Sequence, residues 1–178
     1  MITFVAVVLA AIIIDVVSKV LVNHFMEIGE VVPLIPRVLS LQFSENSGAA
    51  GGFLSNWAGS NIFFMILNSI LIALIVAVYV YFYRRARIKQ ERVPAFFNVA
   101  FAIFVGGGIG NIVCRIAFGA VRDFIRIDLF TWPIFNFADV WIVVGAIMLV
   151  IYFLFMNKDW IRTRTPDALA QPTEAADE

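Results

Sequence analysis

The chain has 178 residues, of which 62% are hydrophobic and only 15% are charged, and Phe alone occurs 18 times. With a mean hydropathy of +0.92, this composition is that of an integral membrane protein. The formal net charge is zero, so neither a basic nucleic-acid-binding surface nor an acidic disordered chain is indicated. We therefore expect membrane lipids and no nucleic acid among its partners.

The first apolar segment, residues 3–22, is long enough to cross about 30 Å of hydrocarbon as a helix. It lacks the basic start and the small-residue cleavage site of a removable signal peptide, so we expect a retained transmembrane helix. Asp15 and Lys19 are four residues apart and hence on one helix face, where pairing lowers the cost of burying either charge. A purely structural pair and a role at an active site are equally compatible with this spacing.

Residues 23–60 are less hydrophobic and contain the turn formers Gly29, Pro33 and Pro36. The alternation over residues 38–43 favours a short strand or a small sheet lying on the membrane surface. In the run 46–52, small residues allow another backbone to approach closely, and Asn46 offers both a donor and an acceptor. A loop of this length is typical of a functional segment.

Three more apolar segments have the length of a bilayer crossing: residues 62–83, 94–113 and 138–155. We interpret the GGGIG run at 106–110 as a close-packing helix face, because small residues let transmembrane helices approach. The polar residues after the last span predict a single transmembrane domain over residues 1–164 and a disordered tail over residues 165–178.

Basic residues predict the orientation of the chain. Residues 84–92 contain five basic residues and one acid, and Lys158, Arg162 and Arg164 follow the last span. Such Lys and Arg excess is typical of cytoplasmic loops, so both termini are expected in the cytoplasm. Residues 23–60 and about 115–137 then lie on the outer face, together with most of the unusual polar side chains.

Asp123 and Asp139 are the candidate catalytic residues. A charge beside hydrocarbon costs several kcal/mol unless it is paired or reaches water, which marks ionisable residues in apolar surroundings as functional candidates. Two carboxylates held close together share a proton, so one can activate water while the other polarises a peptide carbonyl. The structural alternative is that these aspartates form ion pairs with Arg115, Arg122 or Arg126.

Other chemistries have weaker support. A single histidine, His24, and a single cysteine, Cys114, do not suggest a protease with a histidine-activated nucleophile. The acidic residues lack the distinctive spacing of an oxygen-ligand metal site. We expect no metal and no cofactor.

Four runs occur in a characteristic order: DVVSK at 15–19, NSGAAGG at 46–52, GNIVCRIAFGAVRDF at 110–124 and FNFAD at 135–139. Through them the chain resembles the lipoprotein signal peptidase family, also called signal peptidase II, over nearly all of its length. The resemblance implies an all-α integral membrane protein with four transmembrane helices. It also implies a small extracytoplasmic loop, rich in β structure and carrying an interfacial helix, between helices one and two.

The resemblance further implies an aspartic endopeptidase of the bacterial cytoplasmic (inner) membrane whose active site is at the extracytoplasmic face. Its substrate would be a prolipoprotein with a diacylglyceryl cysteine, cleaved on the N-terminal side of that cysteine. The catalytic pair would be Asp123 and Asp139. Seven further residues would bind substrate or support the pair: Asp15, Lys19, Asn46, Gly48, Asn111, Arg115 and Asn136.

Three features depart from the family pattern. Cys114 occupies a position that is usually aspartate, Gly51 one that is usually aromatic, and the connection from Asp123 to Asp139 is short. A non-catalytic paralogue therefore remains an alternative. So does a small transporter or scaffold with Asp15, Lys19 and Arg115 along an ion path, although no inverted repeat is evident.

Overall fold

The computed structural model describes residues 2–48, 57 and 59–156. Four helices in this part of the chain are long and apolar enough to cross a membrane, as predicted. The fourth span, Phe137–Met156, consists of a helix and a π-helical turn, η2 (Tyr152–Met156), that continues it. The helices are α1 (Ile2–Phe25), α2 (Ser60–Ile88), α3 (Ala95–Phe118) and α4 (Phe137–Ile151).

Three helices are longer than predicted, and α2 and α3 extend furthest past their predicted ends. Helix α2 continues through Ile88, so Arg84, Arg85 and Arg87 are helical rather than part of a loop. Helix α3 continues to Phe118 and ends at Gly119, whose φ of +77° forms a left-handed cap, so Arg115 lies in its last turn. Long basic side chains can keep their charge in water while their stems cover apolar surface, which allows a helix to extend past the apolar span.

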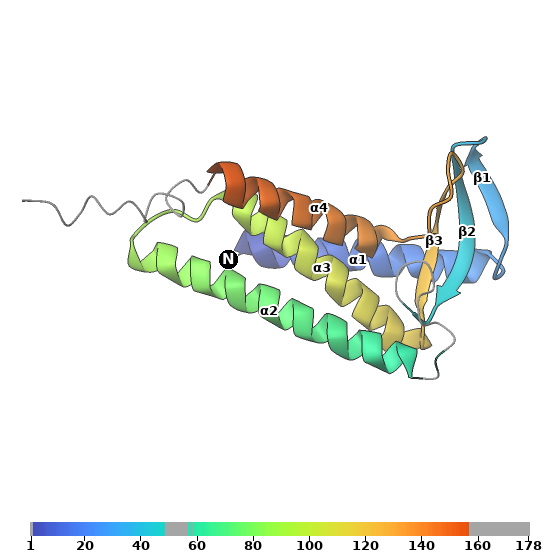
Figure 1. Ribbon diagram of the computed structural model, residues 1–178, viewed down its shortest axis with the longest axis horizontal. Coiled ribbons are helices and arrows are strands. Elements are labelled where there is room, and N and C mark those ends of the chain that lie inside the picture. The colour runs from blue at the N-terminus through green and yellow to red at the C-terminus, as the bar shows by residue number, and fades with distance from the viewer. Residues whose placement is uncertain (1, 49–56, 58, 157–178) are drawn as a thin grey trace, which may run out of the picture.

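A three-stranded antiparallel sheet crosses one end of the bundle (Figure 1). The first loop supplies β1 (Val31–Ile35) and β2 (Leu39–Asn46), and the segment between α3 and α4 supplies β3 (Val121–Ile127). The prediction confined the β structure to the first loop and missed β3, because its sequence VRDFIRI does not alternate strictly between apolar and polar residues. Strand β2 is the partner of β3: Ser44 pairs with Asp123 and Asn46 pairs with Val121.

Some predictions fall on residues outside the described ranges. They are the expected interfacial helix of the first loop, Gly51, the basic residues after the fourth span, and the tail over residues 165–178.

Helix α3 is the central helix, and its glycines allow the others to approach it. A Cβ added to Gly106 would lie 2.7 Å from the Ala11 side chain of α1, and one on Gly108 would lie 2.7 Å from Ile72 of α2. A Cβ on Gly107 would lie 2.5 Å from the backbone oxygen of Ala138 in α4. The GGGIG run therefore packs closely, as predicted, but its glycines contact three different helices rather than forming a single face.

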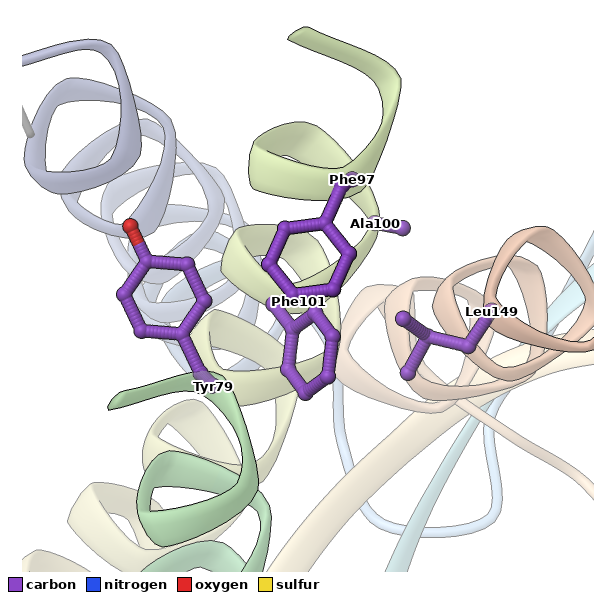
Figure 2. Close-up of a cluster of buried hydrophobic side chains, with 5 residues drawn as sticks. All are labelled: Tyr79, Phe97, Ala100, Phe101 and Leu149. Atoms are coloured by element: carbon purple, nitrogen blue, oxygen red, sulfur yellow. The ribbon is translucent and has the colours of Figure 1, made fainter. Parts of the chain in front are cut away.

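An aromatic cluster holds the helices together at the end away from the sheet. Figure 2 shows Tyr79 of α2 beside Phe97 and Phe101 of α3, with Leu149 of α4 on the other side. Phe4 of α1 stacks on Tyr79 with ring centroids 4.2 Å apart. The Tyr79 hydroxyl donates to Asn98 Oδ1 at 3.0 Å, which adds a polar link between α2 and α3. Packing and such hydrogen bonds are what hold helices together in lipid.

Candidate active site

Strand β3 places Asp123 in a covered position. Four consecutive residues of this strand, Val121 to Phe124, are buried, so both faces of the strand are covered there. Phe124 packs with Val22 and Phe43. The Asp123 carboxylate instead accepts hydrogen bonds from Asn136 Nδ2 at 2.6 Å and Asn46 Nδ2 at 3.0 Å. The Asp123 residue is only 4% exposed.

Asp139 is held by the first turn of α4. Asn136 caps this helix: its Oδ1 accepts from the Asp139 backbone N–H, and Asp139 Oδ2 accepts from the Asn136 backbone N–H, each at 3.1 Å. This reciprocal pair is a capping box, here with an aspartate in the third position. A negative charge in the first turn also interacts favourably with the helix dipole.

Asn136 joins the two carboxylates. Its side-chain Nδ2 donates to Asp123, while its side-chain oxygen and backbone N–H both engage Asp139. The residue is fully buried. The two aspartates, from a strand and a helix, therefore lie on either side of one enclosed amide.

Asn111 of α3 presents a donor to the other oxygen of Asp139. Its Oδ1 accepts from Lys19 Nζ at 2.8 Å and from Asn136 Nδ2 at 3.3 Å. Its Nδ2 therefore faces Asp139 Oδ1, at 3.0 Å. Lys19 thus fixes which end of the Asn111 amide reaches the aspartate.

Asp15 and Lys19 form a fully buried ion pair at 2.7 Å. Asp15 Oδ1 also accepts from the Ala138 backbone N–H at 2.9 Å, so the pair connects α1 to the start of α4. Gly110 leaves the space for this carboxylate, because a Cβ there would collide with Asp15 Oδ2. With each charge hydrogen-bonded, the pair is an internal support of the site.

Arg115 donates hydrogen bonds to backbone carbonyl oxygens rather than pairing with a carboxylate. Its guanidinium donates to the carbonyl oxygens of Ser47 at 3.2 Å and Gly48 at 2.6 Å, and to Asn61 Oδ1 at 3.1 Å. Gly48 N–H in turn donates to Asn46 Oδ1, so Arg115 steadies the turn that carries Asn46. Asn61 was not predicted, and only its place in a polar cluster near the second span could have suggested it.

The structural alternative for the aspartates is not observed in the described part of the chain. There, neither Asp123 nor Asp139 forms an ion pair with an arginine. Arg122 pairs with Glu45 at 3.4 Å and Arg126 pairs with Asp128 at 2.6 Å.

The electrostatics of the site disfavour ionisation of both acids. Burial raises the pKa of Asp123 to about 6, and the negative charge of Asp139 acts in the same direction. Hydrogen bonds from Asn46 and Asn136 oppose this shift. Asp123 therefore keeps its proton to a higher pH than an ordinary aspartate, which favours the single shared proton that acid–base catalysis by a carboxyl pair requires.

Cys114 is buried and hydrogen-bonded to the backbone, as expected for a cysteine with a structural role. It is 2% exposed, its thiol donates to the Ala120 carbonyl, and its sulfur accepts from the Arg122 backbone N–H, each at 3.4 Å. The thiol therefore bridges the turn between α3 and β3. Arg115, the residue after it, has its own set of acceptors without a carboxylate at position 114.

Comparisons with known proteins agree with this architecture. A lipoprotein signal peptidase of Halalkalibacterium halodurans is 40% identical over 153 residues, covering 85% of this chain and 89% of the relative. One of Halothermothrix orenii is 33% identical over 152 residues, covering 85% and 95%. A solved bacterial membrane enzyme superposes with a TM-score of 0.73 at 27% identity, covering 93% of this chain and 94% of that enzyme.

The family model described as signal peptidase (SPase) II matches residues 7–155. That range contains the four membrane spans apart from residues 2–6 and Met156, and every residue of the hydrogen-bond network around Asp123 and Asp139. The chain belongs to the signal peptidase II family.

Proposed function

We propose that this protein is an aspartic endopeptidase that removes the signal peptide from prolipoproteins, with Asp123 and Asp139 as its catalytic pair. Membership of the signal peptidase II family supports the activity. The observation that carries the assignment of the pair is that Asn136 donates to both carboxylates, from its side-chain Nδ2 to Asp123 and from its backbone N–H to Asp139. Asp15, Lys19, Asn46, Gly48, Asn111 and Arg115 position the pair and its surroundings.

The chemistry follows from one shared proton. The ionised carboxylate takes a proton from water as the water oxygen attacks the scissile carbonyl carbon. The protonated carboxyl donates to the carbonyl oxygen and so stabilises the developing negative charge. The C–N bond then breaks as the leaving nitrogen receives a proton from the carboxyl pair, which took up a proton from the attacking water. The products are a signal peptide with a new carboxylate and a lipoprotein with a free amino terminus at its diacylglyceryl cysteine.

We also propose that the site faces the extracytoplasmic side of the bacterial cytoplasmic membrane. The basic residues at the end of α2 lie at the opposite end of the bundle from the sheet, and such residues favour the cytoplasm (Figure 1). Near the sheet, Leu129, Phe130 and Trp132 are more than half exposed. Exposed aromatic side chains are typical of a membrane interface, which is where a lipidated substrate would present its cleavage site.

The observations give less support to the two alternatives. An ion path along Asp15, Lys19 and Arg115 would need charges open to water, whereas these three are buried and hydrogen-bonded. A non-catalytic paralogue would not need two carboxylates with matched amide donors.

The experiment is cleavage of a diacylglyceryl-modified prolipoprotein by purified protein. Asp123→Asn and Asp139→Asn should each reduce the cleavage rate by at least about 10³-fold, because neither amide can take up the proton from water. Asp128→Asn is the matched control: it removes a carboxylate next to β3 that pairs with Arg126, and it should retain most of the activity. Normal cleavage by either dyad variant would refute the catalytic assignment.

A further inference from the structure

The end of the bundle opposite the sheet carries a basic cluster beside an open groove on α2. The groove is shallow and open, and all of its lining residues belong to α2 or to its C-cap, Lys89. Its lining residues recur every three or four positions, so they form one face of the helix. They include the apolar Ala73, Ala77 and Val80, and then the basic Arg84, Arg85 and Lys89.

The charges at this groove have one sign. Within the described residues, none of those that line it is acidic. Glu91 lies nearby, but its 4.0 Å pair with Lys89 joins two side chains that are each at least half exposed. Such a pair contributes little and leaves the cluster positive.

The groove is on a face of α2 that the protein does not cover. Helix α2 is the least buried of the four spans. It is held to α3 from its other side, by Tyr79 and by the Asn68 amide, which donates to the Gly108 carbonyl at 3.0 Å. Below the basic cluster, the small side chains of Ala73 and Ala77 leave a depression at the depth of the acyl chains.

We propose that this groove binds one anionic glycerophospholipid. The phosphate lies at Arg84, Arg85 and Lys89, since guanidinium groups bind phosphate oxygens in a bidentate manner. One acyl chain lies along Ala73, Ala77 and Val80. Basic pockets at the cytoplasmic end of transmembrane helices favour anionic lipids on these grounds.

A neighbouring cavity provides room for the rest of the headgroup. It has a volume of about 180 Å³ and shares Arg85 and Lys89 with the groove. Its lining also includes Arg92, Tyr152 and one acidic residue, Glu91, so its basic residues outnumber its acidic one. The site is distant from Asp123 and Asp139, so the proposal does not depend on the catalytic assignment.

The test is native mass spectrometry of the delipidated, detergent-solubilised protein. The protein is titrated with phosphatidylglycerol and, separately, with phosphatidylcholine of the same acyl chains. The first phosphatidylglycerol should bind in preference to phosphatidylcholine. Arg85→Gln should weaken that first binding step about fivefold. Arg87→Gln is the matched control, because it removes the same charge from the same helix at a residue that lines neither the groove nor the cavity. It should change the affinity less than twofold.

A second variant tests the acyl chain without changing any charge. Ala73→Leu combined with Ala77→Leu fills the groove and should weaken phosphatidylglycerol binding by a similar factor. Equal weakening by Arg85→Gln and Arg87→Gln would overturn the proposal in favour of diffuse charge attraction. Unchanged binding by the double leucine variant would overturn the proposal that an acyl chain lies along this face of α2. Displacement of the lipid by excess glycerol phosphate would show a site for free phosphate esters and overturn the lipid assignment.

Discussion

Asn136 makes three contacts, two through its side chain and one through its backbone N–H. An apolar or a carboxylate side chain could not make both side-chain contacts. The amide nitrogen of Asn136 donates to Asp123, its amide oxygen caps α4, and its backbone N–H donates to Asp139. A carboxylate in its place would add a third negative charge and lose the donor to Asp123. A longer amide would displace the cap. The residue therefore determines both where the two acids lie and how they are hydrogen-bonded.

The raised pKa of Asp123 predicts how activity depends on pH. If Asp123 and Asp139 act as the proposed pair with one shared proton, activity should fall as the pH rises through about 6, the raised pKa of Asp123 in the free enzyme. The measurement is kcat/KM for prolipoprotein cleavage between about pH 5 and pH 9. The fall in kcat should occur at a higher pH than the fall in kcat/KM. Bound substrate excludes water and so further disfavours ionisation of the second carboxyl group.

The control for this profile is Asp128→Asn, because the Asp128 carboxyl lies outside the pair. This variant should show the same pH dependence of kcat/KM and of kcat as the parent protein. A value of kcat/KM that stays constant up to pH 9 would contradict the shared proton. The shared proton would also be contradicted if a variant without Asp123 kept some cleavage and its kcat/KM fell at the same pH.

At the scale of elements, the site depends on how closely α3 approaches its neighbours. Gly107 lies against the Ala138 carbonyl of α4, one residue before Asp139. Gly110 lies against Asp15 of α1, which itself holds the Ala138 N–H. Small residues on α3 thus bring the first turn of α4 to the place where Asn111 can reach Asp139.

Gly107→Ala is predicted to damage both stability and activity. The new Cβ would lie 2.5 Å from a backbone oxygen and 3.0 Å from Trp141 Cβ, so α4 must move. Overpacking of this kind costs about 1–3 kcal/mol. The apparent unfolding temperature in detergent should fall, and cleavage should fall with it.

Ala117→Val is the comparison variant for that prediction, since it adds bulk to an exposed position of the same helix. It should leave the unfolding temperature and the cleavage rate close to those of the parent protein. Equal behaviour of the two variants would mean that the α3–α4 contact does not position Asp139.

At the scale of the whole molecule, the proposed catalytic pair and the basic end of α2 lie at opposite ends of one helical bundle. The sheet and the two aspartates lie at one end, and the connection between α2 and α3 lies at the other (Figure 1). The aromatic cluster around Tyr79 ties all four helices together near the second end. The site end is held by a smaller apolar cluster around Val22, Phe43 and Phe124 together with the polar contacts of the two aspartates.

The proposed orientation predicts which residues a membrane-impermeant maleimide can label. In a Cys114→Ser background, Glu27→Cys lies near the sheet and should be labelled in intact spheroplasts. Glu91→Cys lies between α2 and α3 and should be labelled only after the membrane is permeabilised. Both parent side chains are exposed, so labelling reports sidedness rather than burial. The reverse pattern would place the active site in the cytoplasm.

Local features of this chain were determined by the sequence itself. The four membrane spans follow from the length of each apolar run, and the Asp15–Lys19 pair follows from a spacing of four residues on a helix. The glycine run packs closely because small side chains permit close approach wherever the neighbouring helix comes from. Each of these depends on residues that are near one another in the chain.

The construction of the site was decided only by tertiary structure. Asp123 lies on a third strand because β2, far away in the sequence, supplies its partner. Asn46 reaches Asp123 across 77 positions and Lys19 reaches Asn111 across 92. Arg115 binds backbone carbonyls of the first loop instead of an aspartate. Hydrogen-bond partners so distant in sequence are chosen by how the helices pack, and a pattern of residue types along the chain does not contain that information.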